Sequence, residues 1–155
     1  MKILGEKGIG KLLKEFLQIC FYGGIVLLLL LPFLLKMVGL HLNVTAGVIY
    51  PNGIALLVIV YQFIGLFDSL KNNNPFCMEN VKRLKNAGIA SLVEAVLWVI
   101  DLTYELVLVQ NFDPVNILVL VFLFILFVGV AIALYILAEL IKQGTEYKVE
   151  NELTI

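Results

Sequence analysis

Three acidic side chains interrupt an otherwise apolar stretch of the sequence and are its strongest candidates for chemistry. Glu94, Trp98, Asp101 and Glu105 are spaced at i, i+4, i+7 and i+11, which places them on one face of a helix. Ionisable groups at membrane depth normally face a helix bundle or a water-filled cavity. This set, the acidic stripe, therefore predicts an intramembrane polar site.

A second interpretation of the acidic stripe is structural. In it, Asp101 and Glu105 lie near the outer membrane interface, paired with Lys36 or His41, and Glu94 is the only deep carboxyl group. In both interpretations Glu94 should face other helices, because exposing a carboxylate to lipid costs about 2.5 kcal/mol or more. The sequence leaves the two interpretations open.

The sequence contains none of the common residue patterns for catalysis or metal binding. His41 is the only histidine, and one imidazole without neighbouring ligands is a poor metal site. Cys20 and Cys77 lack both metal-ligand spacing and the pattern of a disulfide scaffold, so we expect free thiols. We therefore expect a protein that is not an enzyme, with no cofactor, no metal and no small-molecule substrate that the sequence identifies.

The composition indicates a membrane protein. Of the 155 residues, 61% are hydrophobic and only 15% are charged, and the mean hydropathy is +1.01. So few charges could not cover the apolar surface of a water-soluble domain. The formal net charge of −1 provides no field that attracts nucleic acid, so direct nucleic-acid binding is not expected.

Four stretches are apolar enough to cross a bilayer as α-helices, which requires about 20 residues each. The third is the weakest, because the acidic stripe interrupts it. The pattern predicts an all-α integral membrane four-helix bundle that forms one domain over residues 1–155, with residues 139–155 as a cytoplasmic tail. The expected spans are about 16–38, 51–70, 87–109 and 115–138.

The basic residues predict which ends of these spans face the cytoplasm. Lys and Arg in short flanking segments are retained on the cytoplasmic side. Ten of the eleven basic residues lie before the first span, between the second and third, or after the fourth, and only Lys36 lies on the other side. We therefore expect a multi-pass protein of the cell membrane, with both termini and the middle loop in the cytoplasm.

Prolines mark the expected helix starts, because the first turn of a helix does not need the missing N–H. Asp113-Pro114 is typical of the start of the fourth helix, and Asn74-Pro75 predicts a similar start before the third span. Pro51 is expected to open the second span. Pro32 lies inside the first span, where we expect a kink.

The two cytoplasmic segments are both expected to be helical. After Asn74-Pro75, apolar residues recur at helical spacing with charged residues between them, which predicts an amphipathic helix that runs into the third span. Its apolar positions are Phe76, Val81, Leu84 and Ala87 or Gly88. The fourth helix keeps its pattern past Ala138, with Gly144 as a weak point, and then becomes acidic.

Short motifs in these segments resemble a bacterial family. They are Asn74-Pro75-Phe76, Glu79-Asn80, Arg83-Leu84 and Gly88 in the middle segment, and Leu137-Ala138-Glu139, Gly144 and Glu150-Asn151-Glu152-Leu153-Thr154-Ile155 at the end. On these residues the chain resembles DUF2975, a family of small four-helix membrane proteins with no established activity. Members are often encoded beside a small helix-turn-helix regulator of the Cro/C1 type, so the resemblance implies the membrane component of a regulatory pair.

The motifs concentrate on the cytoplasmic face, so our leading hypothesis is a regulatory protein that binds a partner there. We expect Arg83 to pair with Glu139, which the fourth helix brings to the same interface; the alternative is contact with lipid phosphates. The expected partners are membrane lipid, the helix-turn-helix regulator and a second copy of the chain. The candidate partner-binding residues are Pro75, Phe76, Arg83, Glu139, Glu150, Asn151 and Glu152.

The alternative hypothesis is a small transporter or channel subunit that uses the acidic stripe. Four spans alone rarely enclose an aqueous path, so this function would require an oligomer. Ion or proton flux that depends on Glu94 would distinguish it from the partner-binding hypothesis.

Overall fold

The computed structural model describes residues 9–37, 42–71, 74–110 and 113–153. Its helices are α1 (Ile9–Met37), α2 (Leu42–Lys71), α3 (Met78–Tyr104) and α4 (Pro114–Leu153), and a π-helical turn, η1 (Glu105–Val109), continues α3. The described part of the chain contains no β-strand. The all-α prediction is therefore confirmed.

Three of these helices are long and apolar enough to cross a membrane. The candidate spans are Gly10–Leu34, Ile49–Leu70 and Pro114–Asn151, and they lie in α1, α2 and α4. The third expected span, residues 87–109, is covered by α3 and η1, but its acidic residues lower its hydropathy. The structure thus supports a protein with membrane-spanning helices, at three of the four expected stretches.

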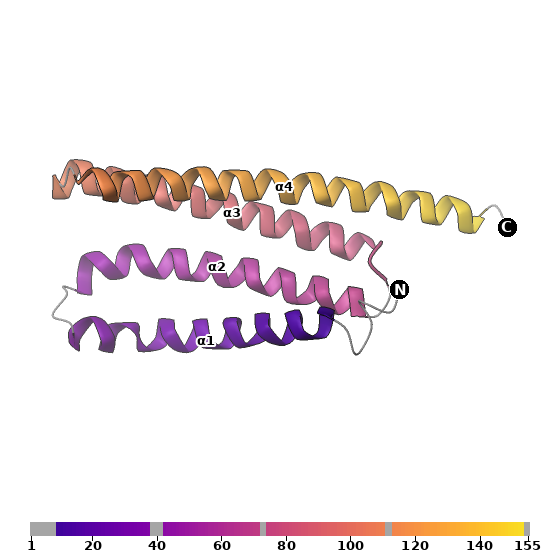
Figure 1. The fold of residues 1–155 in the computed structure, drawn as a ribbon, viewed down its shortest axis with the longest axis horizontal. Helices are drawn as coiled ribbons and strands as arrows, with labels where there is room; N and C mark the ends of the chain where they lie inside the picture. Colours follow the sequence, from indigo (N-terminus) through magenta and orange to yellow (C-terminus); the bar gives the residue numbers. More distant parts are fainter. Residues whose placement is uncertain (1–8, 38–41, 72–73, 111–112, 154–155) are drawn as a thin grey trace.

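The helices pack side by side in the order of the chain (Figure 1). α1 packs on α2, α2 on α3, and α3 on α4. Within the described residues, no Cα atom of α1 lies within 8 Å of one in α3 or α4, and none of α2 lies within 8 Å of one in α4. The expected four-helix bundle is therefore open, because its first and fourth helices do not meet.

The main apolar core lies between α3 and α4, near the start of α3. It consists of Val81, Leu84, Ala87, Leu134 and Ala138, with Phe63, Leu66 and Ile141 packed against it. The α3 residues of this core are those that the helical spacing predicted to be apolar, and their burial confirms the amphipathic pattern. Phe76 is the exception, because it precedes α3.

Glycines permit close approach where helices meet. A Cβ atom at Gly53 of α2 would lie 2.5 Å from Leu28 of α1, and one at Gly88 of α3 would lie 3.1 Å from the Tyr135 ring of α4. Small residues at contacts between membrane helices let the backbones come close enough for extensive van der Waals packing.

The proline signals were partly correct. α4 begins at Pro114, and the Asp113 carboxylate accepts a hydrogen bond from the Val115 backbone N–H at 3.2 Å, as predicted. Pro32 lies within α1, also as predicted. Pro51 does not open α2, which begins nine residues earlier at Leu42. A proline lacks only one donor, and membrane helices accommodate it when neighbours satisfy the freed carbonyl.

α4 is longer than a bilayer is thick. Its 40 residues extend about 60 Å at 1.5 Å per residue, twice the hydrocarbon thickness of roughly 30 Å. Its C-terminal part continues beyond the start of α3 (Figure 1). The starts of α1 and α3, the end of α2 and the C-terminal half of α4 lie together, and we call this the tail end of the molecule.

Candidate functional site

The connector between α2 and α3, residues 74–77, is held at both of its ends. The Asn74 backbone N–H donates to the Ser69 carbonyl at 3.0 Å, which continues the last turn of α2. The Asn80 side chain donates to the Pro75 carbonyl at 2.9 Å and is itself only 1% exposed. The prediction that Asn74-Pro75 starts a helix is therefore wrong. α3 begins instead at Met78, after an extended Cys77.

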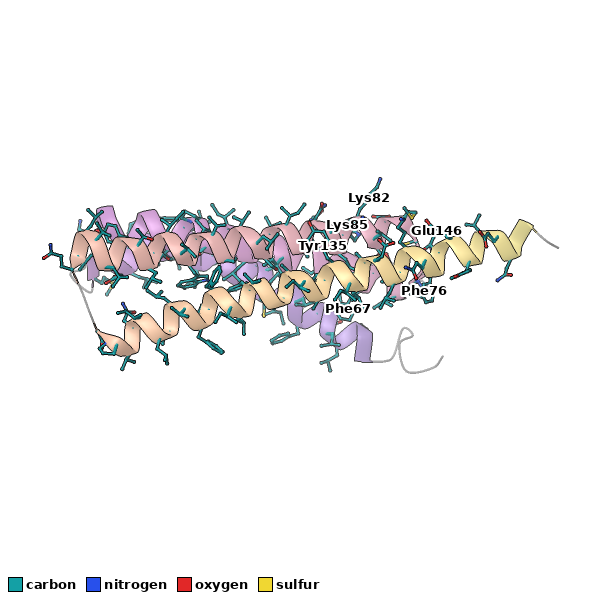
Figure 2. The ribbon with its side chains drawn as sticks, turned by 90° about the horizontal axis from the view of Figure 1, so that it is seen from above. Phe67, Phe76, Lys82, Lys85, Tyr135 and Glu146 are labelled. Carbon is teal, nitrogen blue, oxygen red and sulfur yellow. The ribbon has the colours of Figure 1, made fainter. Side chains whose placement is uncertain are left out.

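The Phe76 side chain extends from the connector and packs on the tail part of α4. A Cβ atom at Gly144 would lie 2.7 Å from the Phe76 ring, so a glycine is required for this close contact. Figure 2 shows Phe76 beside α4, near Glu146. The Phe76 side chain is still 48% exposed. The contact fixes the connector against α4 and leaves part of an aromatic ring available to other molecules.

Arg83 does not form the ion pair expected from the sequence. Its guanidinium pairs with Glu79 one turn earlier in α3 and lies against Gly65 of α2, where no Cβ atom would fit. Glu139 pairs with Lys142 at 3.6 Å, within α4. The expected Arg83–Glu139 pair is wrong because Arg83 faces α2, whereas Glu139 is on α4.

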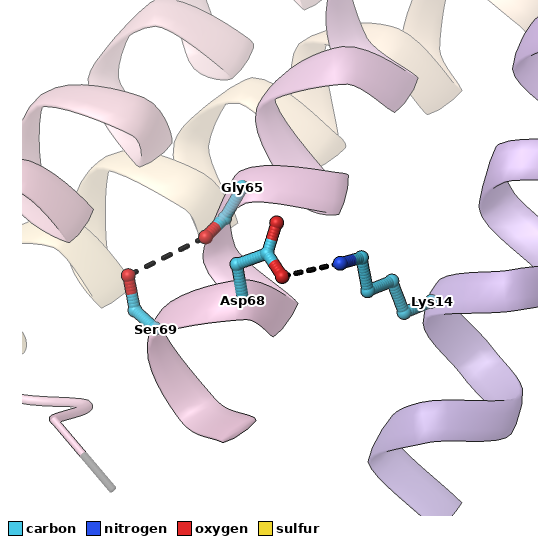
Figure 3. Close-up of polar contacts among 4 residues, drawn as sticks. All are labelled: Lys14, Gly65, Asp68 and Ser69. Carbon is cyan, nitrogen blue, oxygen red and sulfur yellow. Dashed lines mark hydrogen bonds and ion pairs between the residues drawn. The ribbon is translucent and has the colours of Figure 1, made fainter. Parts of the chain in front are cut away.

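An ion pair joins α1 to α2 at the same end. Lys14 of α1 pairs with Asp68 near the end of α2, and the Ser69 hydroxyl donates to the Gly65 carbonyl at 3.4 Å (Figure 3). The Lys14 side chain is 23% exposed and that of Asp68 47% exposed. An ion pair this open to solvent contributes at most about 1 kcal/mol to stability. The Lys14–Asp68 pair therefore sets how α1 lies against α2 but adds little to the stability of the protein.

The tail part of α4 combines exposed apolar and charged side chains. Leu140, Tyr147 and Val149 are each at least half exposed. Glu150 and Asn151 are exposed in the same helix, which also includes Glu152, whose side chain is outside the described set. The α3–α4 joint, meaning the connector, the start of α3 and the tail of α4, thus brings all the candidate partner-binding residues to one end of the molecule.

Glu94 and Asp101 of the acidic stripe are buried, which agrees with the prediction that Glu94 faces other helices. Glu94 is 0% exposed, and neither carboxyl oxygen has a hydrogen bond of normal geometry within the described structure, although the Leu56 backbone of α2 interacts with it more weakly. The indole Nε1 of Trp98 is also buried without a hydrogen-bond acceptor among the described residues. Two adjacent buried polar groups without hydrogen bonds are unusual, since most such groups have partners.

Asn52 of α2 is a hydrogen-bond partner of the acidic stripe, which it contacts at Asp101. Its side-chain amide donates to the Asp101 carboxylate at 3.3 Å, and both residues are 7% exposed. The described partner of Asp101 is therefore this amide and not Lys36; His41 lies outside the described residues. Glu105 is half-buried in η1. Asn52 was missed because it adjoins Pro51, which was interpreted as the start of a helix.

The described residues contain no group of three His, Cys, Asp or Glu side chains that could hold a metal ion. The stripe provides Glu94, Asp101 and Glu105 along one helix, spread over more than ten residues. At 1.5 Å per residue, its two ends are about 16 Å apart along the axis. The three carboxyl groups can line a path, but they cannot converge on one ion.

A family model described as a protein of unknown function, DUF2975, matches residues 39–155. The chain belongs to the DUF2975 family. The family match includes α2, α3 and α4 and every motif on which the resemblance was based, so that resemblance is confirmed. It begins after α1, the helix that contacts only α2. No curated protein and no solved structure matches the chain.

Proposed function

We propose that this DUF2975 protein is a non-enzymatic, multi-pass membrane protein that presents its α3–α4 joint to a protein partner in the cytoplasm. The observation that carries the proposal is the contact of Phe76 with Gly144, which fixes the α2–α3 connector on the part of α4 that extends beyond the bilayer. A pre-ordered surface binds a partner without the entropic cost of ordering it first. The family motifs have a role in this arrangement, because they build the joint.

The distribution of charge supports a cytoplasmic position for the joint. All described basic residues except Lys36 lie at the tail end, which is the pattern of segments retained in the cytoplasm. All four helices are proposed to cross the membrane, with α3 as the third span between α2 and α4. Packing of its polar face against those neighbours accounts for its lower hydropathy.

The proposed partner is a soluble protein that recognises an aromatic and acidic helical surface. Phe76 and Tyr147 offer exposed aromatic rings, which are common anchors of protein interfaces. Glu146 and Glu150 add negative charge along the same part of α4. The specific candidate is a small helix-turn-helix regulator, which the family resemblance implies. A second copy of this chain, which is not a soluble protein, is the alternative occupant of the surface.

Recovery of partners from native membranes tests this function. Phe76→Ala and Tyr147→Ala should each reduce the recovery of a cytosolic partner about tenfold or more, which is the usual effect of removing an aromatic anchor. Phe122→Ala is the matched control, because Phe122 is an exposed aromatic residue of α4 outside the joint. Truncation after Gly144 should abolish recovery and leave membrane insertion intact. If every variant retains all the proteins that co-purify with the parent chain, the joint is not the docking site.

A second candidate function is supported by the buried Glu94 carboxyl group. A carboxyl group that is fully buried without a hydrogen bond is available to bind and release a proton or a cation. The protein would then be a transporter or channel subunit, completed by further copies. Liposomes containing the purified protein would show proton or ion flux that Glu94→Gln abolishes. Liposomes without flux would leave partner binding as the function.

A further inference from the structure

A groove of about 650 Å³ runs between α2 and α3, and it plays no part in the proposed docking surface. Its lining includes Ala55 and Val58 of α2 and Ala90 and Val93 of α3, and it is almost entirely apolar. Both alanines are 7% exposed. Small residues therefore form the floor of the groove and larger aliphatic ones its sides. Pockets of roughly 300–1,000 Å³ with mostly apolar walls are typical ligand sites.

The groove has the length of one membrane leaflet. On α3 it extends from Asn86 to Leu97, a distance of about 16 Å along the helix axis. The hydrocarbon core of a bilayer is roughly 30 Å thick, so this distance is about half of it. The only polar side chains of its lining, Gln62 and Asn86, are both at the end nearer the start of α3. This is the arrangement that a lipid requires, with hydrocarbon along the groove and polar groups at the membrane surface.

Two lysines continue the groove beyond its polar end. Lys82 precedes Asn86 by four residues, so it lies on the face of α3 that lines the groove; Lys85 precedes Ile89 by four and flanks the edge of that face. Long side chains of a helix lean towards its N-terminus, which carries both ammonium groups away from the apolar part. Figure 2 shows the two lysines on the same edge of α3.

Neither lysine forms an ion pair among the described residues. Glu79, three residues before Lys82, pairs with Arg83, and Asp68 of α2 pairs with Lys14. The positive charge at the end of the groove is therefore not compensated within this part of the chain. Basic pockets between membrane helices are typical binding sites for the phosphate of an acidic lipid.

We propose that this groove binds an anionic phospholipid, with one acyl chain along α2 and α3 and the phosphate held by Lys82 and Lys85. The occupant is a lipid of the leaflet at the tail end of the molecule. The proposal needs neither the docking surface nor the acidic stripe, and it would stand if both failed. Such a lipid would link α2 to α3 at the point where the row of helices is open to the membrane.

Native mass spectrometry of the purified protein in detergent tests the site. Phosphatidylglycerol and phosphatidylcholine with identical acyl chains are added separately. We expect phosphatidylglycerol to be retained more strongly, and the double variant Lys82→Gln, Lys85→Gln to bind it about tenfold more weakly. The matched control is Lys11→Gln, Lys142→Gln, which removes the same charge away from the groove and should retain the lipid. Equal retention of the two lipids by the parent chain would overturn the proposal.

A second pair of variants tests whether the groove itself holds the chain of the lipid. Val93→Phe fills the groove and should weaken retention of phosphatidylglycerol. Val96→Phe adds the same bulk at an exposed position outside the groove lining and should not. If Val93→Phe binds as well as Val96→Phe, the lysines attract lipid only through surface charge, and the groove is not the site.

Discussion

The buried polar residues are of two kinds, those with a hydrogen-bond partner and those without one. Asn80 and Asp101 are buried with hydrogen bonds, and each one ties two segments together. Glu94 is buried without one. A buried polar group without a partner costs free energy, whereas a paired group roughly offsets its own desolvation. The two kinds of residue should therefore respond in opposite directions to replacement by an apolar side chain.

Glu94→Leu should stabilise the protein, because it removes a buried carboxyl group that has no hydrogen bond. We expect the free energy of unfolding in detergent micelles to rise by roughly 1–3 kcal/mol. Asp101→Leu should lower it by a similar amount, because the Asn52 amide loses the carboxylate to which it donates. Thermal unfolding followed by Trp98 fluorescence measures both. Destabilisation by Glu94→Leu would show that the carboxyl group has a partner in the membrane.

Because Phe76 packs on Gly144, alanine should have different effects on stability at two glycines of α4. Replacing glycine by alanine in a helix normally stabilises it by about 1 kcal/mol. Gly129→Ala should do so, because nothing lies within 4 Å of the added methyl group. At Gly144 the methyl group would meet the Phe76 ring, so Gly144→Ala should give no gain in the free energy of unfolding. Equal gains in the two variants would contradict the packing of the joint.

At the scale of helices, α1 differs from the other three. It contacts only α2, and the family match begins after it. The packing of α2, α3 and α4 should therefore not depend on α1. A chain of residues 39–155 is expected to insert and to keep the emission maximum of Trp98, the only tryptophan. A red-shifted emission in that shortened chain, reporting water around α3, would show that α1 is required for the packing.

The sequence predicted helices better than it predicted their contacts, for physical reasons. Helical periodicity and the Asp113 cap are local signals, so the core positions of α3 and the start of α4 were correct. Asn74-Pro75 carries a similar local signal, but the connector is not helical, and the Asn80 side chain donates a hydrogen bond to its Pro75 carbonyl. Arg83 was assigned to the wrong helix, because only the packed structure shows that it faces Gly65 of α2. A single sequence carries no comparable local signal for which residues of two helices will contact each other.

For the molecule as a whole, the proposed docking surface requires the tail end to lie on the cytoplasmic side of the membrane. The α3–α4 joint can bind a cytosolic partner only if the α2–α3 connector is in the cytoplasm. Cys77 belongs to that connector and is partly exposed, and Cys20 is the only other cysteine. The thiol of Cys77 is therefore a natural reporter of sidedness.

Labelling of intact cells with a membrane-impermeant maleimide measures on which side of the membrane Cys77 lies. In the Cys20→Ser background, Cys77 should remain unlabelled until the cells are permeabilised. The control carries Cys20→Ser, Cys77→Ser and Val109→Cys. Its thiol is at an exposed position in η1, at the end of the molecule opposite the connector, and it should be labelled in intact cells. A cytoplasmic connector predicts that the reagent does not label Cys77 in intact cells and does label the control. Labelling of Cys77 in intact cells would reverse the topology and contradict the proposed cytoplasmic docking surface.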